Sequence, residues 1–421
     1  MSSSHASSNA PVPALAPAPP AVDTTAATTT TNTAPQDVPT HGQPAPPIVA
    51  LADTSSSHPQ VQTLDESSQT QTQPQTHGEP TLAEAQAAHD ATVIGQNLEP
   101  DSNHSDTDSA FGSDGNSSSS TSLASSIMNY EYSNGRRYHG YRSGAYPLPN
   151  DDEEQDRLDL LHHIFLLMLG GKLSNVPFTR PPQRVLDIGT GTGIWAIDYA
   201  DENPEASILG TDLSPIQPTW VPPNAKFYID DAESDWVYQP DEHFDYIHVR
   251  GMSGSIGDWD RLCAQAYAHT VPGGWVEFQE PEAWVRSDDD TITQAENIQL
   301  WQQLVNDAAD VFKKEIRIAD TLKQKMENAG FVDVSERIVK VPVGPWPKDA
   351  KMKEIGRYQR EHMAMGIEPY TFGFIGKILG WSEQECKVII AKVINEVRDR
   401  NLHLYIQFFF VVGRKPGDAT Y

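Results

Sequence analysis

The sequence predicts an α/β fold with a doubly wound, mainly parallel sheet, and three observations after Arg184 carry this prediction. Apolar segments of strand length alternate with amphipathic segments of helix length. The first strand runs into a turn with three glycines in five positions, Gly189, Gly191 and Gly193. This glycine turn, then Asp212, then Asp230 and Asp231 follow three successive strands in that order. Strands that alternate with helices form a parallel sheet with helices on both faces.

Each element is predicted from its own pattern. A helix begins after the N-cap Asn150 or Asp151, with acids in its first turn and an apolar stripe behind them. Further helices begin at Ile194 and in "WDRLCAQAYAHT", and one ends at Gly330. The predicted strands are "RVLDI", "ASILGTDL", "AKFYID", "FDYIHV", "GGWVEFQE" and the apolar run "LHLYIQFFFVVGRK".

The chain divides into a tail and one folded domain. Residues 1–125 consist largely of Ser, Thr, Pro, Ala and Gln, and no Lys or Arg precedes Arg136, so we expect this tail to be disordered. Residues 126–421 form the domain: an N-terminal lid and helix at 126–170, a core at 184–280 and a helical cap inserted at 346–400. The aromatic stretch before the first helix is too irregular for a strand; it contains Tyr130, Tyr132, Tyr138, Tyr141 and Tyr146.

Charge and cysteine usage exclude several classes of function. The net charge is −28, which argues against direct nucleic-acid binding and against an anionic membrane surface. Cys263 and Cys386 lie far apart in helical segments, so neither a disulfide framework nor a metal site is expected. No signal peptide or membrane-spanning run is evident, which predicts an intracellular protein of the cytoplasm, the nucleus or both.

The glycine turn predicts a ligand that lies against the backbone. A dinucleotide motif G-x-G-x-x-G would require glycine where the chain has Ile194. It would also have an apolar residue in place of Asp187, whose carboxylate repels a pyrophosphate. S-adenosylmethionine fits better, because it carries an ammonium and a sulfonium group and no phosphate.

The other acids fit the same ligand. Asp212 follows the second strand, where a carboxylate can accept hydrogen bonds from ribose hydroxyls, although NAD enzymes use the same device. Asp230 or Asp231 is placed to accept from an adenine amino group, and a solvated loop acid is the alternative for each.

Polar residues at the ends of the fourth and fifth strands could bind a ligand or could have a purely structural role. Arg250 binds the carboxylate of the cofactor or an acidic substrate, or it forms a salt bridge with a nearby acid. His248 is expected in the core. Glu280 and Glu282 are expected to end the fifth strand on a solvated rim rather than to act as a base.

Several motifs together resemble a known family. "VLDIGTGTG", "GTDLS", "DDAESDW", "FDYIHVRGM", "PGGWVEFQE" and "AGFVDV" resemble the successive motifs of class I S-adenosylmethionine-dependent methyltransferases. The stretch "NGRRYHGYRSGAYPLPNDDEEQDRLDLLHHIF" resembles the fungal LaeA-like members, which include velvet-associated regulators of secondary metabolism. The resemblance covers residues 126–415 and implies a Rossmann-like sheet of seven strands with an antiparallel last strand. It implies cofactor contacts at Asp187, Gly189, Thr190, Gly191, Gly193, Asp212, Leu213, Asp230, Asp231, Ala232 and Arg250.

The sequence does not identify the catalytic residues. No Asn-Pro-Pro-Tyr type tetrapeptide follows "FDYIHV", and positioning alone supplies much of the rate of methyl transfer. The candidates are Arg250, Tyr138 and Tyr141, and the tyrosines before the first helix either close over the site as a lid or pack that segment onto the sheet.

Three functions follow from these patterns. The leading hypothesis is an active methyltransferase whose acceptor is a small molecule or a protein. The alternative is a cofactor-binding regulatory or scaffold protein of a velvet-type complex with little or no turnover. An NAD-dependent oxidoreductase is disfavoured by the spacing of the glycines.

Overall fold

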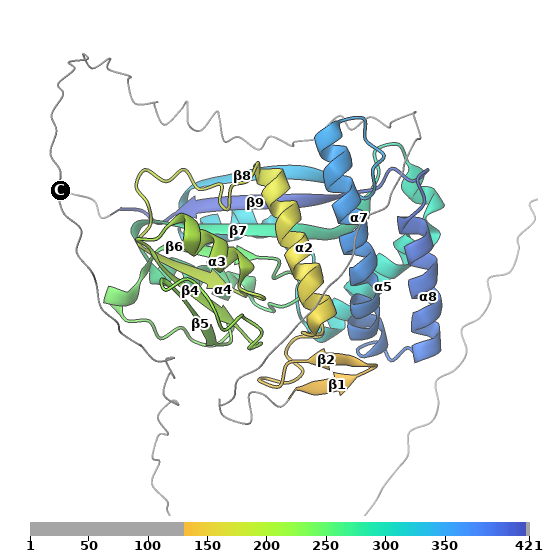
Figure 1. Cartoon of the computed structure of the whole chain (residues 1–421), viewed down its shortest axis with the longest axis horizontal. Coiled ribbons are helices and arrows are strands. Elements are labelled where there is room, and N and C mark those ends of the chain that lie inside the picture. Colours follow the sequence, from red (N-terminus) through yellow and green to blue (C-terminus); the bar gives the residue numbers. More distant parts are fainter. Residues whose placement is uncertain (1–129, 418–421) are drawn as a thin grey trace, which may run out of the picture. The chain divides into compact units, whose positions relative to one another are not determined.

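The computed structural model describes residues 130–417, and there the predicted α/β fold is confirmed (Figure 1). Seven strands form one sheet in the order β5-β4-β3-β6-β7-β9-β8. β9 is antiparallel to both neighbours and the other pairs are parallel, as the resemblance implies. The strands are β3 (Arg184–Ile188), β4 (Ser207–Asp212), β5 (Ala225–Ile229), β6 (Phe244–Arg250), β7 (Thr270–Arg286), β8 (Val332–Pro342) and β9 (Tyr405–Arg414). The tail predicted at 1–125 lies outside the described residues.

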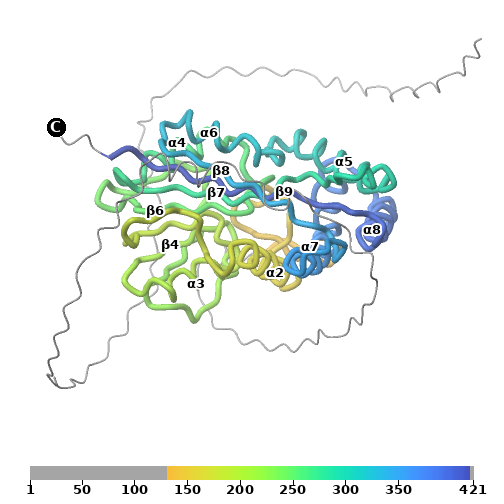
Figure 2. Tube along the Cα trace, turned by 90° about the horizontal axis from the view of Figure 1, so that it is seen from above, coloured from red at the N-terminus to blue at the C-terminus, as the bar shows by residue number. Residues whose placement is uncertain are grey.

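Helices cover both faces of the sheet (Figure 2). The helices on one face are α2 (Asp152–Leu169), α3 (Ile194–Glu202) and α7 (Ala350–Tyr370). Those on the other are α4 (Trp259–His269), α5 (Glu296–Phe312) and α6 (Leu322–Ala329). Along β6, Tyr246 packs with the α3 side and Ile247 with the α4 side, because successive side chains of a strand point to opposite faces.

The predicted helix ends are confirmed. Asp151 is the N-cap of α2, and its Oδ1 accepts a hydrogen bond from the backbone N–H of Glu154 at 3.1 Å. Gly330 ends α6 in the left-handed conformation, with φ +102°. The Asp151 cap fixes where α2 begins. Further along α2, Asp159 accepts a hydrogen bond from Thr192 Oγ1 in the glycine turn at 2.7 Å. No helix between residues 130 and 417 is both long enough and apolar enough to cross a membrane.

The segment between β8 and β9 is helical, as its pattern predicts. It contains α7, a π-helical turn at Thr371–Gly376 and α8 (Glu383–Val397). Pro369, near the end of α7, has no N–H to continue the helical hydrogen bonds. α7 packs beside α2, so this inserted segment reaches the edge of the sheet where the glycine turn lies (Figure 1).

The prediction that the aromatic stretch is too irregular for strands is wrong. β1 (Glu131–Ser133) and β2 (Arg136–Tyr138) form an antiparallel hairpin. Asn134 and Gly135 make its two-residue turn, with φ of +51° and +80°. Asn-Gly is the strongest short-range hairpin signal, because this turn requires positive φ at both positions.

Candidate active site

The glycine turn leaves bare backbone between β3 and α3. Gly189, Gly191 and Gly193 all have positive φ, of +67°, +58° and +81°. A β-carbon on Gly189 would lie 2.1 Å from Sδ of Met252, and one on Gly193 would lie 2.8 Å from the ring of Phe227. Only glycine therefore fits at these two positions without displacing a neighbour.

Asp187 lies beneath this turn and shapes it. It is 3% exposed, and its two carboxylate oxygens accept from Thr190 Oγ1 at 2.6 Å and His248 Nδ1 at 2.7 Å. His248 is fully buried and stacks on Trp195, which confirms its predicted place in the core. The attraction of Asp187 for a cationic ligand group stays a prediction.

Asp212 ties the end of β4 to the glycine turn. Its Oδ2 accepts from the Gly191 N–H at 2.9 Å, and its Oδ1 accepts from the Ser214 N–H at 2.8 Å. Burial raises the pKa of Asp212, while these two backbone hydrogen bonds act in the opposite direction. The adjacent Leu213 is partly buried. The carboxylate thus lies directly beside the bare backbone of the turn.

The acids after β5 differ in exposure. Asp230 is exposed, and its Oδ1 accepts from the N–H of Asp231 at 2.8 Å. Asp231 is partly buried, and its Oδ1 accepts from the N–H of Glu233 at 3.0 Å. Ala232 is also partly buried, and its carbonyl oxygen accepts from the indole N–H of Trp236. Of the two acids, Asp231 is therefore the better placed to line an enclosed ligand.

Arg250 ends β6 on the same face of the sheet as Asp187. Its Nη2 lies 3.1 Å from Nδ1 of His162, and its guanidinium lies 5.0 Å from the ring centre of Phe165 in α2. Burial lowers the pKa of Arg250 to about 10. It forms no ion pair with any residue from 130 to 417, so the alternative of a structural salt bridge is wrong.

The segment between β2 and α2 lies across the ends of the strands. Nη2 of Arg142 donates to Ser234 Oγ at 3.0 Å, and its Nε lies 3.5 Å from Asp231 Oδ2. At the other end, Nδ2 of Asn150 donates to Ser214 Oγ at 3.2 Å. The segment is thereby attached to the loops after β4 and β5.

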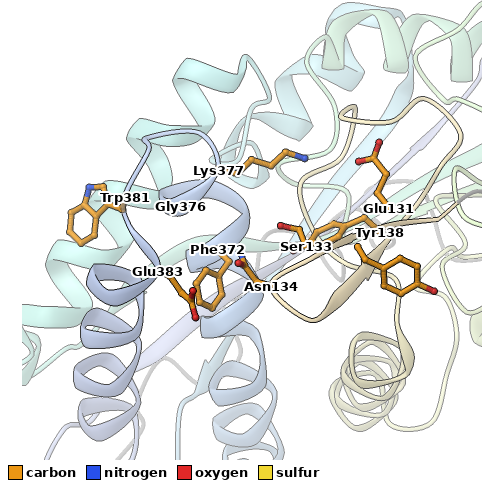
Figure 3. Close-up of a pocket in the computed structure, with 10 residues that line it drawn as sticks. Glu131, Ser133, Asn134, Tyr138, Phe372, Gly376, Lys377, Trp381 and Glu383 are labelled. Atoms are coloured by element: carbon orange, nitrogen blue, oxygen red, sulfur yellow. The ribbon is translucent and has the colours of Figure 1, made fainter.

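The three tyrosines of this region do not come together. Tyr138 is buried and helps to line a cavity of about 380 Å³ between the hairpin and the connection from α7 to α8. Phe372, Lys377 and Trp381 line the same cavity (Figure 3). Tyr141 and Tyr146 are partly buried. Burial raises the pKa of Tyr146, and the charge of Asp212 adds a smaller contribution. The cavity in Figure 3 is not lined by the glycine turn.

The expected solvated rim at Glu280 and Glu282 is wrong. β7 continues to Arg286 and pairs with β9, so both side chains are buried. Glu280 accepts from the N–H of Met252 at 2.8 Å and from the N–H and Oγ of Ser253 at 3.0 and 2.8 Å. Burial raises its pKa to about 7. Glu282 pairs with Arg286.

Four site residues are missed by motif reasoning. Glu154 and Arg157 form a buried bidentate pair on α2, at 2.6 and 2.9 Å. Nη1 of Arg157 donates to Nε2 of His362 at 2.6 Å, and Tyr370 lies over the same guanidinium at 5.9 Å. The signal for the first two was their helical spacing on the buried stripe of α2. His362 and Tyr370 carry no local signal, because only the fold brings α7 beside α2.

Comparison with known proteins connects this geometry to a family. The family model described as "Methyltransferase domain" matches residues 160–336. The structure of Haemonchus contortus phosphoethanolamine N-methyltransferase 2 in complex with S-adenosyl-L-methionine is 19% identical, covers 62% of this chain and 52% of that one, and gives a TM-score of 0.35.

Two curated relatives are more similar in sequence than this solved structure. "Methyltransferase pytC" of Aspergillus terreus is 42% identical over 301 residues, which make up 71% of this chain and 92% of that protein. "Secondary metabolism regulator LAE1" of Cochliobolus heterostrophus is 36% identical over 67% of this chain and 94% of that protein. This chain therefore belongs to the fungal LaeA-like family of methyltransferases.

Proposed function

We propose that this chain is an active methyltransferase that binds S-adenosylmethionine across the carboxyl ends of β3, β4 and β5. The observation that carries the proposal is the order of the groups along that edge. The glycine turn, Asp212 and Asp231 follow three strands that lie side by side in the sheet. The backbone of the turn receives the methionine part, Asp212 accepts from the ribose hydroxyls and Asp231 accepts from the adenine amino group.

Arg250 is proposed to hold the carboxylate of the cofactor. A partly buried guanidinium without a carboxylate partner among residues 130–417 loses hydration, and a bound anion offsets that cost. Its pKa of about 10 leaves it charged at neutral pH. Arginine also binds a planar carboxylate through two hydrogen bonds.

Methyl transfer itself requires mainly alignment. A lone pair of the acceptor attacks the methyl carbon, the C–S bond breaks and its electrons return to sulfur as S-adenosylhomocysteine forms. An O–H or N–H acceptor then loses its proton to a base. Holding the reactants in line supplies much of the acceleration, so a dedicated catalytic side chain is not required.

A regulatory role is the second part of the proposal. The relative LAE1 is named a regulator of secondary metabolism, and we propose that this chain acts likewise inside the cell, in the cytoplasm or the nucleus. The competing function is a cofactor-binding scaffold in a velvet-type complex, and the regulator names of the relatives favour it. The two differ in whether methyl groups are transferred.

Cofactor binding is tested by thermal denaturation. S-adenosylmethionine and S-adenosylhomocysteine should raise the melting temperature and NAD should not, because only a ligand of the native state stabilises it. Asp212→Ala should abolish the shift. Asp201→Ala, at an exposed position near the end of α3, is the matched control and should keep it. An unchanged shift in Asp212→Ala contradicts the ribose assignment.

Turnover is tested by incubating the full chain with methyl-labelled cofactor and a host extract. Label in metabolites or protein supports the enzyme. Label in no fraction, together with a retained thermal shift and stable partners after purification, supports the scaffold instead.

A further inference from the structure

Two tyrosines from distant parts of the chain, Tyr146 and Tyr370, pack against the same cluster of buried residues, which includes Leu148 and Phe374. Tyr146 precedes α2, and Tyr370 is the last residue of α7. The charges of Glu154 and Arg157 act on the pKa of both phenols. Asp212 at the end of β4 also acts on Tyr146, and Glu280 in β7 also acts on Tyr370.

The sheet order shows what lies between them. β3 and β6 separate β4 from β7, so the space from Asp212 to Glu280 lies above the glycine turn and above the loop that begins at Gly251. The reactive methyl of a cofactor bound at the turn would face this space. On α2, Arg157 lies 5.9 Å from the ring centre of Tyr370, and Asp159 accepts from Thr192 Oγ1 in the glycine turn at 2.7 Å. The two phenols therefore lie near the turn, on the side where an acceptor would approach the methyl group.

Both hydroxyls are available for a ligand. Tyr146 and Tyr370 are partly buried, and neither donates a hydrogen bond to another residue in the described chain, so each hydroxyl can donate to a ligand. Burial raises the pKa of both phenols, so each keeps its proton and acts as a neutral donor.

The charged groups around the phenols are already compensated. Glu154 and Arg157 form their bidentate pair, and the carboxylate of Glu280 accepts from Met252 and Ser253. A charged acceptor would lose its hydration here without gaining a free counter-charge, which is unfavourable. The surroundings therefore favour an uncharged acceptor.

The π-helical turn at Thr371–Gly376 and the segment that precedes α2 are in close contact. A β-carbon on Gly373, in the π-helical turn, would lie 2.7 Å from the carbonyl oxygen of Pro147. The indole N–H of Trp301 donates to Oγ1 of Thr371 at 2.9 Å and fixes the same turn. Such a close cover suits a small molecule better than a side chain of a folded protein.

We propose that Tyr146 and Tyr370 form the acceptor site, and that the acceptor is a small, uncharged molecule whose oxygen or nitrogen atoms accept hydrogen bonds from both phenols. This inference rests on the proposed function, since an acceptor site has meaning only if methyl transfer occurs.

The experiment uses the full chain, methyl-labelled S-adenosylmethionine and a host extract divided into a protein fraction and a low-molecular-mass fraction. The variants are Tyr146→Phe and Tyr370→Phe, which remove only a hydroxyl. Tyr358→Phe is the matched control, because this tyrosine is on α7 but its ring contacts His163 edge-on, outside the site.

We expect label in the low-molecular-mass fraction with the wild type and with Tyr358→Phe, and about tenfold less with Tyr146→Phe or Tyr370→Phe, as for one lost hydrogen bond. The thermal shift with S-adenosylmethionine should be the same in all four proteins, which shows that each is folded. Undiminished labelling by both site variants, or label in protein alone, overturns the acceptor site while turnover stands. No label with the wild type overturns the proposed turnover and the acceptor site with it.

Discussion

Two groups of loops meet at the carboxyl edge of the sheet, and they are held in place by different means. After β3 and β4, Asp212 accepts from backbone amides of Gly191 and Ser214. Above them, α2 and α7 meet through side chains, and Arg157 contacts His362 across 205 positions of sequence. We call the loops after β3 and β4 the proposed cofactor side, and α2 with α7 the proposed acceptor side. The cofactor side should be sensitive to changes in backbone, and the acceptor side to changes in buried charge.

The largest effect is expected on the acceptor side. Arg157→Met leaves the carboxylate of Glu154 buried without its partner and should lower the free energy of unfolding by about 4 kcal/mol. Chemical denaturation measures this change. The double variant Glu154→Gln/Arg157→Met should lose much less, since no charge is left unpaired. A single variant as stable as the double one would show that the pair is not buried in solution.

The next largest effect on the free energy of unfolding is expected from the protonation of Glu280. Its folded pKa of about 7 lies above the usual value for glutamate, so the native state binds the proton more tightly. This contribution to stability is complete below about pH 4.5 and is lost as pH rises through 7, by about 3 kcal/mol in total. The difference in unfolding free energy between wild type and Glu280→Gln should change by that amount between pH 4.5 and 8. A difference that is constant with pH would contradict the raised pKa.

A pair of glycines tests the sensitivity of the cofactor side to backbone changes. Gly193 and Gly144 both have positive φ, but a β-carbon meets the Phe227 ring only at Gly193. Gly193→Ala should cost about 2 kcal/mol more than Gly144→Ala in chemical denaturation, because it adds overpacking to the same strain. Equal losses would mean that Phe227 moves away freely.

The smallest effect is expected on the affinity for the cofactor, from the ion pair between Arg142 and Asp231 at the surface. Arg142→Ala removes a partly exposed ion pair with Asp231 and should weaken S-adenosylmethionine binding about twofold, or about 0.5 kcal/mol. Titration calorimetry at low and high salt measures it. A loss of tenfold or more would show that Arg142 contacts the cofactor itself.

The cofactor side was largely predictable from the sequence. The glycine turn and Asp212 lie within one local stretch, and their spacing carries the signal. His248 was correctly expected in the core, because an isolated polar residue within a buried strand usually packs there. The roles of these residues toward the cofactor stay predictions.

The acceptor side was not predictable from local patterns. The hairpin was missed because Asn134 and Gly135 were not recognised as a two-residue turn. Glu280 was placed on a rim because its strand was expected to end there, whereas pairing with β9 continues it. Tyr370 meets Arg157 only through the packing of α7 on α2, which no periodicity of either segment reveals.

The contact of Gly373 with Pro147 has a consequence for the order of events in turnover. A β-carbon does not fit between Gly373 and Pro147, so no molecule passes between these two segments while they are in contact. If the proposed acceptor enters at this contact, the two segments have to separate in each cycle, and the rate of that opening limits turnover, whatever the speed of the chemical step.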